Sequence, residues 1–410
     1  MSEKKNVPVI RFPEYSEPWT NYKIGDLYTE RNERGNDNLQ ILSVSIHSGV
    51  SDGELDEENL GKFVRRSEDK SKYKHVYEGD LVFNMMRAWQ GAIGVAKVEG
   101  MISPAYISAI PNENVYPLFM DYAMRTRRAI EEINNHSYGV TDFRKRLYWD
   151  SFVQLTCNLP SVPEQKRIYN FFKDFDSILA LHRRKLEHAK ELKKSLLQKM
   201  FPKSGERYPE VRFPGFTYPW EQRKLYEVAE KICVGFVGTC EKYYTDESGI
   251  PMYRTGNLNG LKLTQDDLKY VTKEFHEQNK KSQLRKGDIL IARHGDSGKA
   301  VNYELSEEAN CLNIVIIRPD LDKCNYQFLA DSINSPTVSQ HIKSLSAGST
   351  QAVINTSEIE KLDVIIPANI DEQNKVAEFL NDLDNLITLH QRELDHLELL
   401  KKALLQKTIV

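Results

Sequence analysis

The clearest pattern of hydrophobic and polar positions lies in two segments that close the two halves of the chain. In residues 164–199 apolar side chains recur at alternating steps of four and three residues, and residues 372–407 repeat this spacing. Such spacing places the side chains on one stripe of an α-helix, as in a coiled-coil seam. The seam positions are Ile168, Phe172, Phe175, Leu179, His182, Leu186 and Ala189, then Val376, Leu380, Leu383, Ile387, His390, Leu394 and Leu397. We therefore expect two long helices, over 164–201 and 372–408, that pair antiparallel.

A second apolar row widens each predicted helix stripe beyond the width of a single seam. Its members are Phe171, Ile178, Leu192 and Leu196 in the first helix, and Phe379, Leu386, Leu400 and Leu404 in the second. Extra apolar surface on a paired helix predicts further partner helices. His182 and His390 occupy equivalent seam positions. We interpret them as a packed, hydrogen-bonded pair and expect no metal ion there.

The two helical segments belong to an internal duplication of the whole chain. Residues 164–199 align with 372–407 without gaps, and 17 of the 36 positions are identical. Near the start of each half, five residues recur 201 positions apart: Phe12, Pro13, Pro18, Trp19 and Lys23, then Phe213, Pro214, Pro219, Trp220 and Lys224. A Gly-Asp pair at 79–80 recurs at 287–288. The chain is therefore a tandem duplication with a period near 208 residues.

Each half begins with short β-like runs that are interrupted by glycine and proline. A helical stretch follows (118–134 and 326–345), then a polar loop and an apolar run that ends at Pro160 or Pro367. Because crossover helices do not separate the runs regularly, we predict an α+β fold with antiparallel strands. The predicted architecture is a tandem duplication of an α/β domain followed by a long helix, with the two helices pairing as an antiparallel coiled coil with pseudo-two-fold symmetry. The predicted boundaries are 1–157 (first domain), 158–204 (first helix and linker), 205–371 (second domain) and 372–410 (second helix).

Composition narrows the class of protein. At 410 residues the chain is long enough for several domains, and 28% of its residues are charged, with a mean hydropathy of −0.55. It contains no apolar run of 18 residues and no apolar segment near its first residue, so we expect neither a membrane span nor a secretion signal. Five cysteines, an odd number without a CxxC pair, are typical of a reducing compartment. We expect a cytoplasmic protein.

Catalytic signatures are missing from the sequence. There is no GxxxxGK[ST] phosphate loop, no GxGxxG after a strand, no HExxH and no GxSxG. The nearest phosphate-loop mimic, residues 295–300, has the wrong glycine spacing. The motifs expected of an adenine or cytosine methyltransferase are also missing. We therefore expect a chain that is not an enzyme and that binds through its two domains.

Taken together, these features resemble the specificity subunits of type I restriction–modification systems, over essentially the whole chain. The resemblance rests on the two helix openings (158–179 and 365–387), the Phe-Pro…Trp starts, the Gly-Asp pairs and SPAY at 103–106. It implies that each domain is a target-recognition domain that reads one half of a bipartite, asymmetric double-stranded DNA site. It also implies that the helices set the spacer and dock two modification subunits, adenine methyltransferases that carry S-adenosylmethionine. Restriction subunits that use ATP and Mg would complete the complex, and this chain would bind no cofactor itself.

Candidate DNA contacts lie on three loops in each domain, because reading base edges requires hydrogen-bonding side chains on loops held by a rigid sheet. In the first domain they are His47, Ser48, Arg87, Gln90, Thr141, Arg144, Lys145 and Arg146. In the second they are Arg254, Thr255, Asn257, Arg293, His294, Ser297, Lys299, Ser349, Thr350 and Gln351. We expect Lys299 to meet phosphate, Trp89 to favour the core over stacking on DNA, and Trp19 and Trp220 to be structural.

The net charge of −3 counts mildly against DNA binding but is unevenly distributed. The four predicted segments carry −3, +6, −4 and −2 in chain order. DNA-facing loops must then be local basic islands such as Arg144–Arg146. The basic first helix lies near the spacer phosphates or faces acidic partner subunits, and we favour the second. Partner subunits would supply part of the affinity for DNA.

Two other functions are compatible with the sequence. A non-catalytic coiled-coil adaptor would bind two protein partners at its end domains, and salt-dependent binding to duplex DNA would argue against it. An enzyme with its own active site would transfer methyl groups as the isolated chain. Related two-domain chains also serve systems that have no restriction component.

Overall fold

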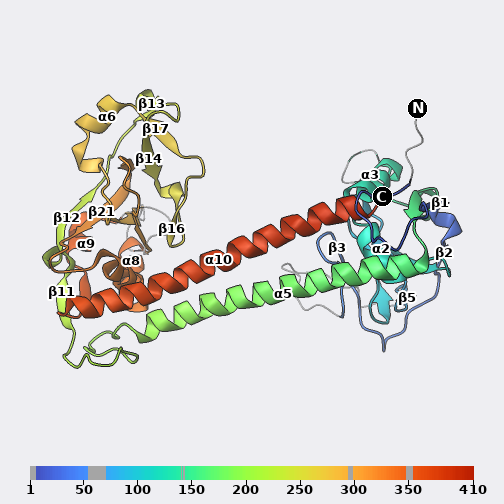
Figure 1. The fold of residues 1–410 in the computed structure, drawn as a ribbon, viewed down its shortest axis with the longest axis horizontal. Helices are drawn as coiled ribbons and strands as arrows, with labels where there is room; N and C mark the ends of the chain where they lie inside the picture. Colours follow the sequence, from blue (N-terminus) through green and yellow to red (C-terminus); the bar gives the residue numbers. More distant parts are fainter. Residues whose placement is uncertain (1–5, 54–70, 140, 142–143, 294–298, 348–353) are drawn as a thin grey trace. The chain divides into compact units, whose positions relative to one another are not determined.

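The computed structural model describes residues 6–53, 71–139, 141, 144–293, 299–347 and 354–410. The chain divides into two compact units, Met1–Arg183 with Arg392–Val410 and Arg184–Gln391. Each unit therefore combines one globular domain with parts of both long helices (Figure 1). The four segments predicted from the sequence give the order along the chain, and as domain boundaries they remain predictions.

The two long helices are α5 (Val162–Lys199) and α10 (Ile370–Thr408). Both begin two residues before the predicted start, and Pro163 lies in the first turn of α5, where its missing N–H breaks no helical hydrogen bond. Within each unit the two helices pair antiparallel, green against red in Figure 1. In unit 1 Lys401 Nζ lies 2.5 Å from Asp176, and in unit 2 Lys193 Nζ lies 2.5 Å from Asp384.

These two ion pairs are repeat copies of one another, because 208 positions separate Asp176 from Asp384 and Lys193 from Lys401. The predicted antiparallel helix pair is confirmed within each unit. Most of the predicted seam positions are buried: Ile168, Phe172, Leu179, Leu186, Ala189, Val376, Leu380, Leu383 and Leu394. His182 Nδ1 lies 3.4 Å from Glu393 on α10. The expected pairing of His182 with His390 stays a prediction.

The first domain is built on a four-stranded sheet in the order β2-β9-β6-β7, with three two-stranded sheets, β1-β10, β3-β4 and β5-β8. Its strands are β1 (Thr20–Lys23), β2 (Tyr28–Glu30), β3 (Val44–Ser45), β4 (Gly49–Val50), β5 (Lys74–Val76), β6 (Leu81–Asn84), β7 (Ile93–Val95), β8 (Gly100–Ile102), β9 (Tyr106–Pro111) and β10 (Thr156–Leu159). Its helices are η1 (Ile24–Asp26), η2 (Ala88–Gln90), α2 (Pro117–Ala123), α3 (Arg127–His136) and α4 (Trp149–Phe152).

The second domain repeats this frame and adds a second four-stranded sheet. The matching sheets are β12-β21-β18-β19 and β11-β22; the added ones are β13-β17-β14-β20 and β15-β16. Its strands are β11 (Glu221–Lys224), β12 (Ala229–Val234), β13 (Tyr244–Thr245), β14 (Ile250–Arg254), β15 (Leu258–Asn259), β16 (Lys262–Leu263), β17 (Lys269–Val271), β18 (Ile289–Ala292), β19 (Ala300–Asn302), β20 (Asn310–Leu312), β21 (Ile314–Pro319) and β22 (Asp363–Ile366). Its helices are η4 (Leu225–Glu227), η5 (Glu241–Tyr243), η6 (Thr255–Asn257), α6 (Lys273–Gln278), η7 (Lys280–Ser282), α7 (Tyr326–Asn334), α8 (Pro336–Ala347) and α9 (Thr356–Glu360).

The shared frame has the same register in both copies. Leu81 pairs with Ala109 in the first domain, and Ile289 pairs with Ile317 in the second, 208 positions later in both strands. Among the described strands, every pair is antiparallel except β14 with β20. The predicted α+β duplication with antiparallel strands is therefore confirmed.

Each predicted helical stretch before the polar loop is in fact two helices. In the first domain α2 ends at Ala123, and α3 begins after Thr126, whose side chain accepts a hydrogen bond from Ala129 N at 3.3 Å. In the second domain Pro336 opens α8 directly after α7. Thr126 starts a new helix because its side chain caps the first turn of α3. Pro336 cannot continue α7 because it has no backbone N–H to donate, but it fits the first turn of α8.

A buried ion pair fixes each long helix to the domain that precedes it. The Glu164 carboxylate, 1% exposed, accepts two hydrogen bonds from Arg11, at 2.7 and 2.8 Å, and one from Trp19 Nε1 at 3.4 Å. In the second copy Glu372 accepts from Arg212 at 2.6 and 2.8 Å and from Trp220 Nε1 at 3.0 Å. The two tryptophans are structural, as expected.

The glutamine next to each of these glutamates completes the joint. Gln165 accepts from Tyr116 N at 2.7 Å and donates to Pro160 O at 2.9 Å. Gln373 likewise accepts from Asn325 N at 2.8 Å and donates to Pro367 O at 2.9 Å. Because both glutamines are fully buried, these bonds replace the water that the amides lose. Among the described residues, no helix combines the length and apolar composition that crossing a membrane requires.

Candidate nucleic-acid interface

The Gly-Asp pairs form tight turns that lead into the central strands β6 and β18. Gly79 and Gly287 have φ of +93° and +90°, a left-handed conformation that favours glycine. In the first domain the buried Asp80 accepts two hydrogen bonds from Arg31, at 2.6 and 3.0 Å, and one from Tyr77 N at 3.0 Å. These pairs hold the start of the strands whose far ends lead into the predicted DNA-binding loops.

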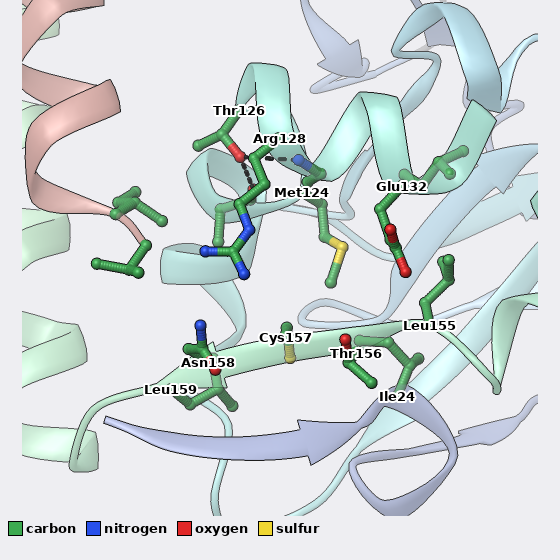
Figure 2. A pocket seen from close by; sticks show the side chains of 15 residues that line it. Ile24, Met124, Thr126, Arg128, Glu132, Leu155, Thr156, Cys157, Asn158 and Leu159 are labelled. Carbon is green, nitrogen blue, oxygen red and sulfur yellow. Dashed lines mark hydrogen bonds between the residues drawn. The ribbon is translucent and has the colours of Figure 1, made fainter. Parts of the chain in front are cut away.

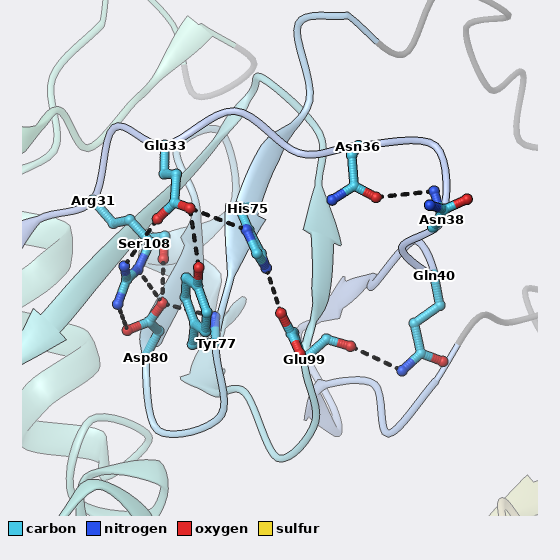
Figure 3. A network of polar contacts seen from close by, with 10 residues as sticks. All are labelled: Arg31, Glu33, Asn36, Asn38, Gln40, His75, Tyr77, Asp80, Glu99 and Ser108. Atoms are coloured by element: carbon cyan, nitrogen blue, oxygen red, sulfur yellow. Dashed lines mark hydrogen bonds and ion pairs between the residues drawn. The ribbon is translucent and has the colours of Figure 1, made fainter.

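The network around Asp80 continues to the neighbouring β5-β8 pair (Figure 3). Tyr77 donates to Glu33 at 3.0 Å and stacks on His75, with ring centroids 4.1 Å apart. His75 Nε2 lies 2.8 Å from Glu99, whereas its Nδ1 lies 3.3 Å from Glu33. The hydrogen bond from Tyr77, with the nearby positive charge, lowers the pKa of Glu33. All of these groups find partners within the network, so we assign it to support rather than to binding.

In the first domain the structure brings the three predicted loops together. Leu147 N donates to Met85 O at 2.9 Å and so joins the loop at 138–146 to the loop at 85–91. Gly91, with φ of +103°, passes so close to the turn after β3 that a Cβ there would lie 3.6 Å from Ile46 O. The predicted residues of this domain therefore lie on adjacent loops.

Most of the predicted side chains in the first domain are exposed. The exposed set comprises His47, Ser48, Arg87, Gln90, Thr141, Arg144 and Arg146. Lys145 is only half-buried and donates to Asn134 Oδ1 at 2.5 Å, and its Nζ lies 5.5 Å from the centroid of the Trp89 ring. Trp89 is also half-buried and donates to Met86 O at 3.0 Å. It therefore holds the 85–91 loop together from the edge of the core.

The turn that carries His47 and Ser48 is supported by Arg125, the second residue after helix α2, and the neighbouring strand β7 by Asp121 of α2. Arg125 donates from its guanidinium to the backbone oxygen of His47. Asp121 accepts from Val95 N at 3.1 Å, and burial raises its pKa. No motif in the sequence marked Arg125 or Asp121, because their role depends on the packing of α2 against the turn.

In the second domain the same backbone hydrogen bond joins two of the predicted loops. Ile354 N donates to Arg293 O at 3.2 Å, the equivalent of the bond between Leu147 and Met85. Arg293 is half-buried, and its Nε has no hydrogen-bond partner among the described residues. Lys299 is half-buried. The other predictions on these loops lie outside the described residues: His294, Ser297, Ser349, Thr350 and Gln351.

The third predicted loop of the second domain is held by its own side chains. Arg254 donates to Asp267 at 2.8 Å, and Thr255 Oγ1 lies 3.5 Å from Asn313 O. Asn257 is 1% exposed; it accepts from Arg254 N at 2.9 Å and donates to Asp266 O at 2.8 Å. Its amide closes the turn and is not available to a base edge, so Asn257 does not belong to the exposed set. This loop follows strand β14, which belongs to the sheet that the first domain lacks among its described residues.

Two cavities lie within the frame of the domains. One cavity, of about 90 Å³, is lined by Arg128 and Glu132 of α3 and by Cys157 of β10; Figure 2 shows these side chains around it. Burial raises the pKa of the Cys157 thiol to about 12, so the thiol is not a reactive thiolate. A cavity in the second domain occupies the equivalent place, with His341 on α8 facing β22. None of the predicted DNA-binding residues lines either of these two cavities between described residues.

Comparisons with known proteins define the class of this duplicated, surface-binding fold. Residues 218–399 match the family model described as the type I restriction modification DNA specificity domain. The matched region covers the second domain and most of α10. The first half, which lies outside the matched region, repeats the same frame, register and joints.

Two relatives from Methanocaldococcus jannaschii support this class. The type I restriction enzyme MjaVIII specificity subunit is 21% identical over 354 residues, which cover 82% of this chain and 81% of the relative. The putative type I restriction enzyme MjaX specificity subunit is 23% identical over 384 residues, covering 87% and 83%. Residues 218–399 therefore belong to the type I restriction modification DNA specificity domain, and the chain is similar over most of its length to specificity subunits of type I restriction enzymes.

Solved structures share the fold. The S subunit of a type I restriction–modification system from M. genitalium superposes with a TM-score of 0.61 at 14% identity, covering 98% of this chain and 99% of that chain. A chain from a study of complex assembly and conformational transition of the type I R-M system gives 0.58 at 18% identity, covering 96% and 98%.

Proposed function

We propose that this subunit reads a bipartite, asymmetric double-stranded DNA site, with one half-site for each domain. The observation that carries the proposal is a contrast within the duplication. The joints around Glu164 and Glu372 repeat bond for bond, whereas the loops that the sheets present differ in sequence and in length. A scaffold that is kept while its loops diverge is what two domains require if they read different half-sites.

The proposed contacts to bases and phosphates come from the exposed loops. In the first domain Arg87, Arg144 and Arg146 are exposed donors beside the hydrogen-bonding groups of His47 and Gln90. Arginine recognises guanine and phosphate, and amide side chains recognise adenine. Both domains are slightly acidic overall, so these arginines form a local basic island. The partner subunits of the assembled complex supply the rest of the grip on the phosphates.

Docking of two modification subunits is proposed for the outer faces of the helices. Large apolar side chains remain exposed there: Phe171, Ile178, Leu181 and Leu192 on α5, and Phe379, Leu386, Leu389 and Leu400 on α10. The members of the first set recur 208 positions later as the second set. Exposed apolar rows of this size mark protein interfaces, and two equal rows fit two copies of one partner.

The chemistry of the complex is assigned to the partners. In this proposal the chain is not catalytic and binds no cofactor. The modification subunits carry S-adenosylmethionine for adenine methylation, and restriction subunits use ATP and Mg for translocation and cleavage. The complex works in the cytoplasm, where the host DNA lies.

Methylation sequencing of a host that expresses this chain with its modification subunit tests the proposal. The expected result is one methylated motif with two half-sites separated by a fixed spacer. Exchanging the loops of one domain, residues 85–91 and 138–146, should change one half-site and leave the other unchanged. Methylation without a motif, or a change in both half-sites, would contradict the assignment of one half-site to each domain.

A coiled-coil adaptor for two protein partners is the alternative that the same complex can exclude. DNA recognition predicts that the assembled complex binds its site with an affinity that falls steeply as salt rises, because phosphate contacts release counterions. An adaptor predicts no difference between the site and a scrambled duplex at any salt concentration. Competition with the scrambled duplex therefore separates the two functions.

A further inference from the structure

Two tyrosines whose rings contact each other in a tilted arrangement are exposed beside the basic island of the first domain. Tyr138 is 59% and Tyr148 39% exposed, and their ring centroids lie 5.1 Å apart at an interplanar angle of 31°. Tyr138 and Arg146 exchange two backbone hydrogen bonds of 3.0 Å, so the ring pair lies at the base of the arginine-bearing loop. None of the sequence motifs marked these rings.

The ring pair lies next to the predicted DNA-binding loop at residues 85–91. The hydrogen bond from Leu147 N to Met85 O joins the two loops between Arg146 and Tyr148. The residue after Met85 is also apolar and exposed: 40% of Met86 is accessible. The two loops thus present aromatic and apolar surface next to arginines. Exposing such surface to water costs free energy, and a binding partner that covers it recovers that free energy.

Charge identifies the class of partner. The segments 85–91 and 138–150 carry four basic side chains and two acidic ones, whereas residues 1–157 as a whole carry a net charge of −3. The aromatic rings therefore lie in the basic part of an acidic domain. An aromatic face next to arginine suits duplex DNA, because thymine methyl groups at base edges and the carbon atoms of deoxyribose offer apolar surface between the phosphates. The apolar rows proposed for protein partners lie elsewhere, on α5 and α10.

We propose that Tyr138 and Tyr148 contact duplex DNA through their ring faces, at base edges and deoxyribose rings of the half-site that the first domain reads. This inference rests on the proposed function and deepens it, because it adds an uncharged contact to a surface otherwise argued from arginines. The second domain offers no copy of the pair: Asn355, which precedes α9, stands where Tyr148 precedes α4. The contact therefore belongs to one half-site.

The test uses the complex assembled with modification subunits and a duplex that carries its methylated motif. Tyr138→Ala and Tyr148→Ala should each weaken binding about tenfold, the loss typical of one aromatic contact to a base. The slope of log affinity against log salt should stay unchanged, because no phosphate contact is lost. The matched control, Arg146→Ala, should reduce that slope by about one charge. Tyr138→Phe should bind like the wild type, because the ring remains.

Scrambling the first half-site should abolish the effect of both tyrosine variants, whereas scrambling the second should not. Unchanged affinity of Tyr138→Ala and Tyr148→Ala, with normal wild-type binding, would overturn this inference and leave the proposed function standing. A loss of modification-subunit binding instead of DNA binding would also overturn it, by assigning the rings to a protein partner. Absence of site-selective binding by the wild-type complex would be the separate failure of the proposed function.

Discussion

Each domain buries an aspartate at the start of its central strand and pairs it with an arginine, but the two arginines come from different parts of the fold. In the first domain Asp80 pairs with Arg31, which directly follows β2. In the second Asp288 pairs with Arg318 of β21, at 2.7 Å for both hydrogen bonds. By strand register, Arg318 corresponds to Ile110 rather than to Arg31. Both copies therefore keep a buried carboxylate that pairs with an arginine, but the arginine stands at a different position in each copy.

A second difference lies where each domain packs on the helices. In unit 1 Tyr122 donates to Asp176 at 2.5 Å, and Asp176 also pairs with Lys401. In unit 2 the equivalent carboxylate, Asp384, pairs with the buried Lys193, and the residue that stands in the place of Tyr122 is Asp331. Burial, opposed by Lys193, raises the pKa of Asp331 to about 7. Near neutral pH the carboxyl group of Asp331 therefore ionises and adds a negative charge in unit 2, whereas Tyr122, at the equivalent place in unit 1, stays uncharged.

The largest expected effect tests whether the helix joints are equal in both copies. Glu164→Gln and Glu372→Gln each leave a largely buried arginine without its carboxylate, so each should lower the free energy of unfolding by about 3–5 kcal/mol. Denaturant unfolding of the full chain measures both. Glu14→Gln is the matched control, because Glu14 and Arg167 form an exposed pair 3.6 Å apart that contributes about 1 kcal/mol or less. Unequal losses at the two joints would show that the duplication is not energetically equivalent.

The exchanged arginines give the next effect. Arg31→Ala should destabilise the first domain by about 2–4 kcal/mol, because Asp80 stays buried without its cation. Adding Ile110→Arg to this variant places an arginine at the position of Arg318 and should restore about half of the loss. Thermal and denaturant unfolding, with hydrogen exchange over β6, report the recovery. If Ile110→Arg restores nothing, the two solutions depend on more than strand register.

The difference between Tyr122 in unit 1 and Asp331 in unit 2 predicts that stability depends on pH at this position in unit 2 and not in unit 1. The pKa of Asp331 is raised in the folded state, so its contribution is present below about pH 4 and is lost as pH rises through 7. Asp331→Asn should therefore stabilise unit 2 by about 2–3 kcal/mol more at pH 8 than at pH 5, because ionisation of the buried carboxyl costs more as the pH rises above its unfolded pKa. Hydrogen exchange of α7 at the two pH values measures this. Tyr122→Phe, the counterpart in unit 1, should have the same effect at both pH values.

The sequence predicted the frame of the molecule well, because the frame depends on patterns that are local or repeated. The seam spacing located α5 and α10 to within two residues, and the duplication made each copy a check on the other. The long helical stretches were predicted as single helices because a capping Thr126 is common inside loops as well as at helix starts. The resemblance also identified the family before any fold was seen.

What the sequence did not predict depends on contacts between distant positions. Nothing in the sequence marked Glu164 and Glu372 as buried, yet both are, and each accepts hydrogen bonds from an arginine about 150 positions away. Asn257 was placed among base-reading residues from its loop composition, but its amide closes its own turn. Exposure cannot be read from residue type, so Tyr138 and Tyr148 were not singled out although both side chains are exposed.

The smallest effect on stability concerns a position beside the exposed rows of the helices, which is apolar in the second copy and charged in the first. Leu399 is 67% exposed, and the residue 208 positions earlier is Glu191. Leu399→Glu makes the two copies alike and should change the free energy of unfolding by no more than about 0.5 kcal/mol, because the side chain is already in water. It should nevertheless weaken docking of one modification subunit of the proposed pair, because a carboxylate would be buried on binding.

Native mass spectrometry of the complex, titrated with modification subunit, counts the copies bound to each variant. The expected result for Leu399→Glu is a larger fraction of complexes with one copy, and Glu191→Leu should shift the balance toward two. Equal occupancy in all three proteins would mean that this position lies outside the docking surface. The two rows would then be equivalent for the partner despite their difference in sequence, and the contrast between the copies would be confined to the domains that read DNA.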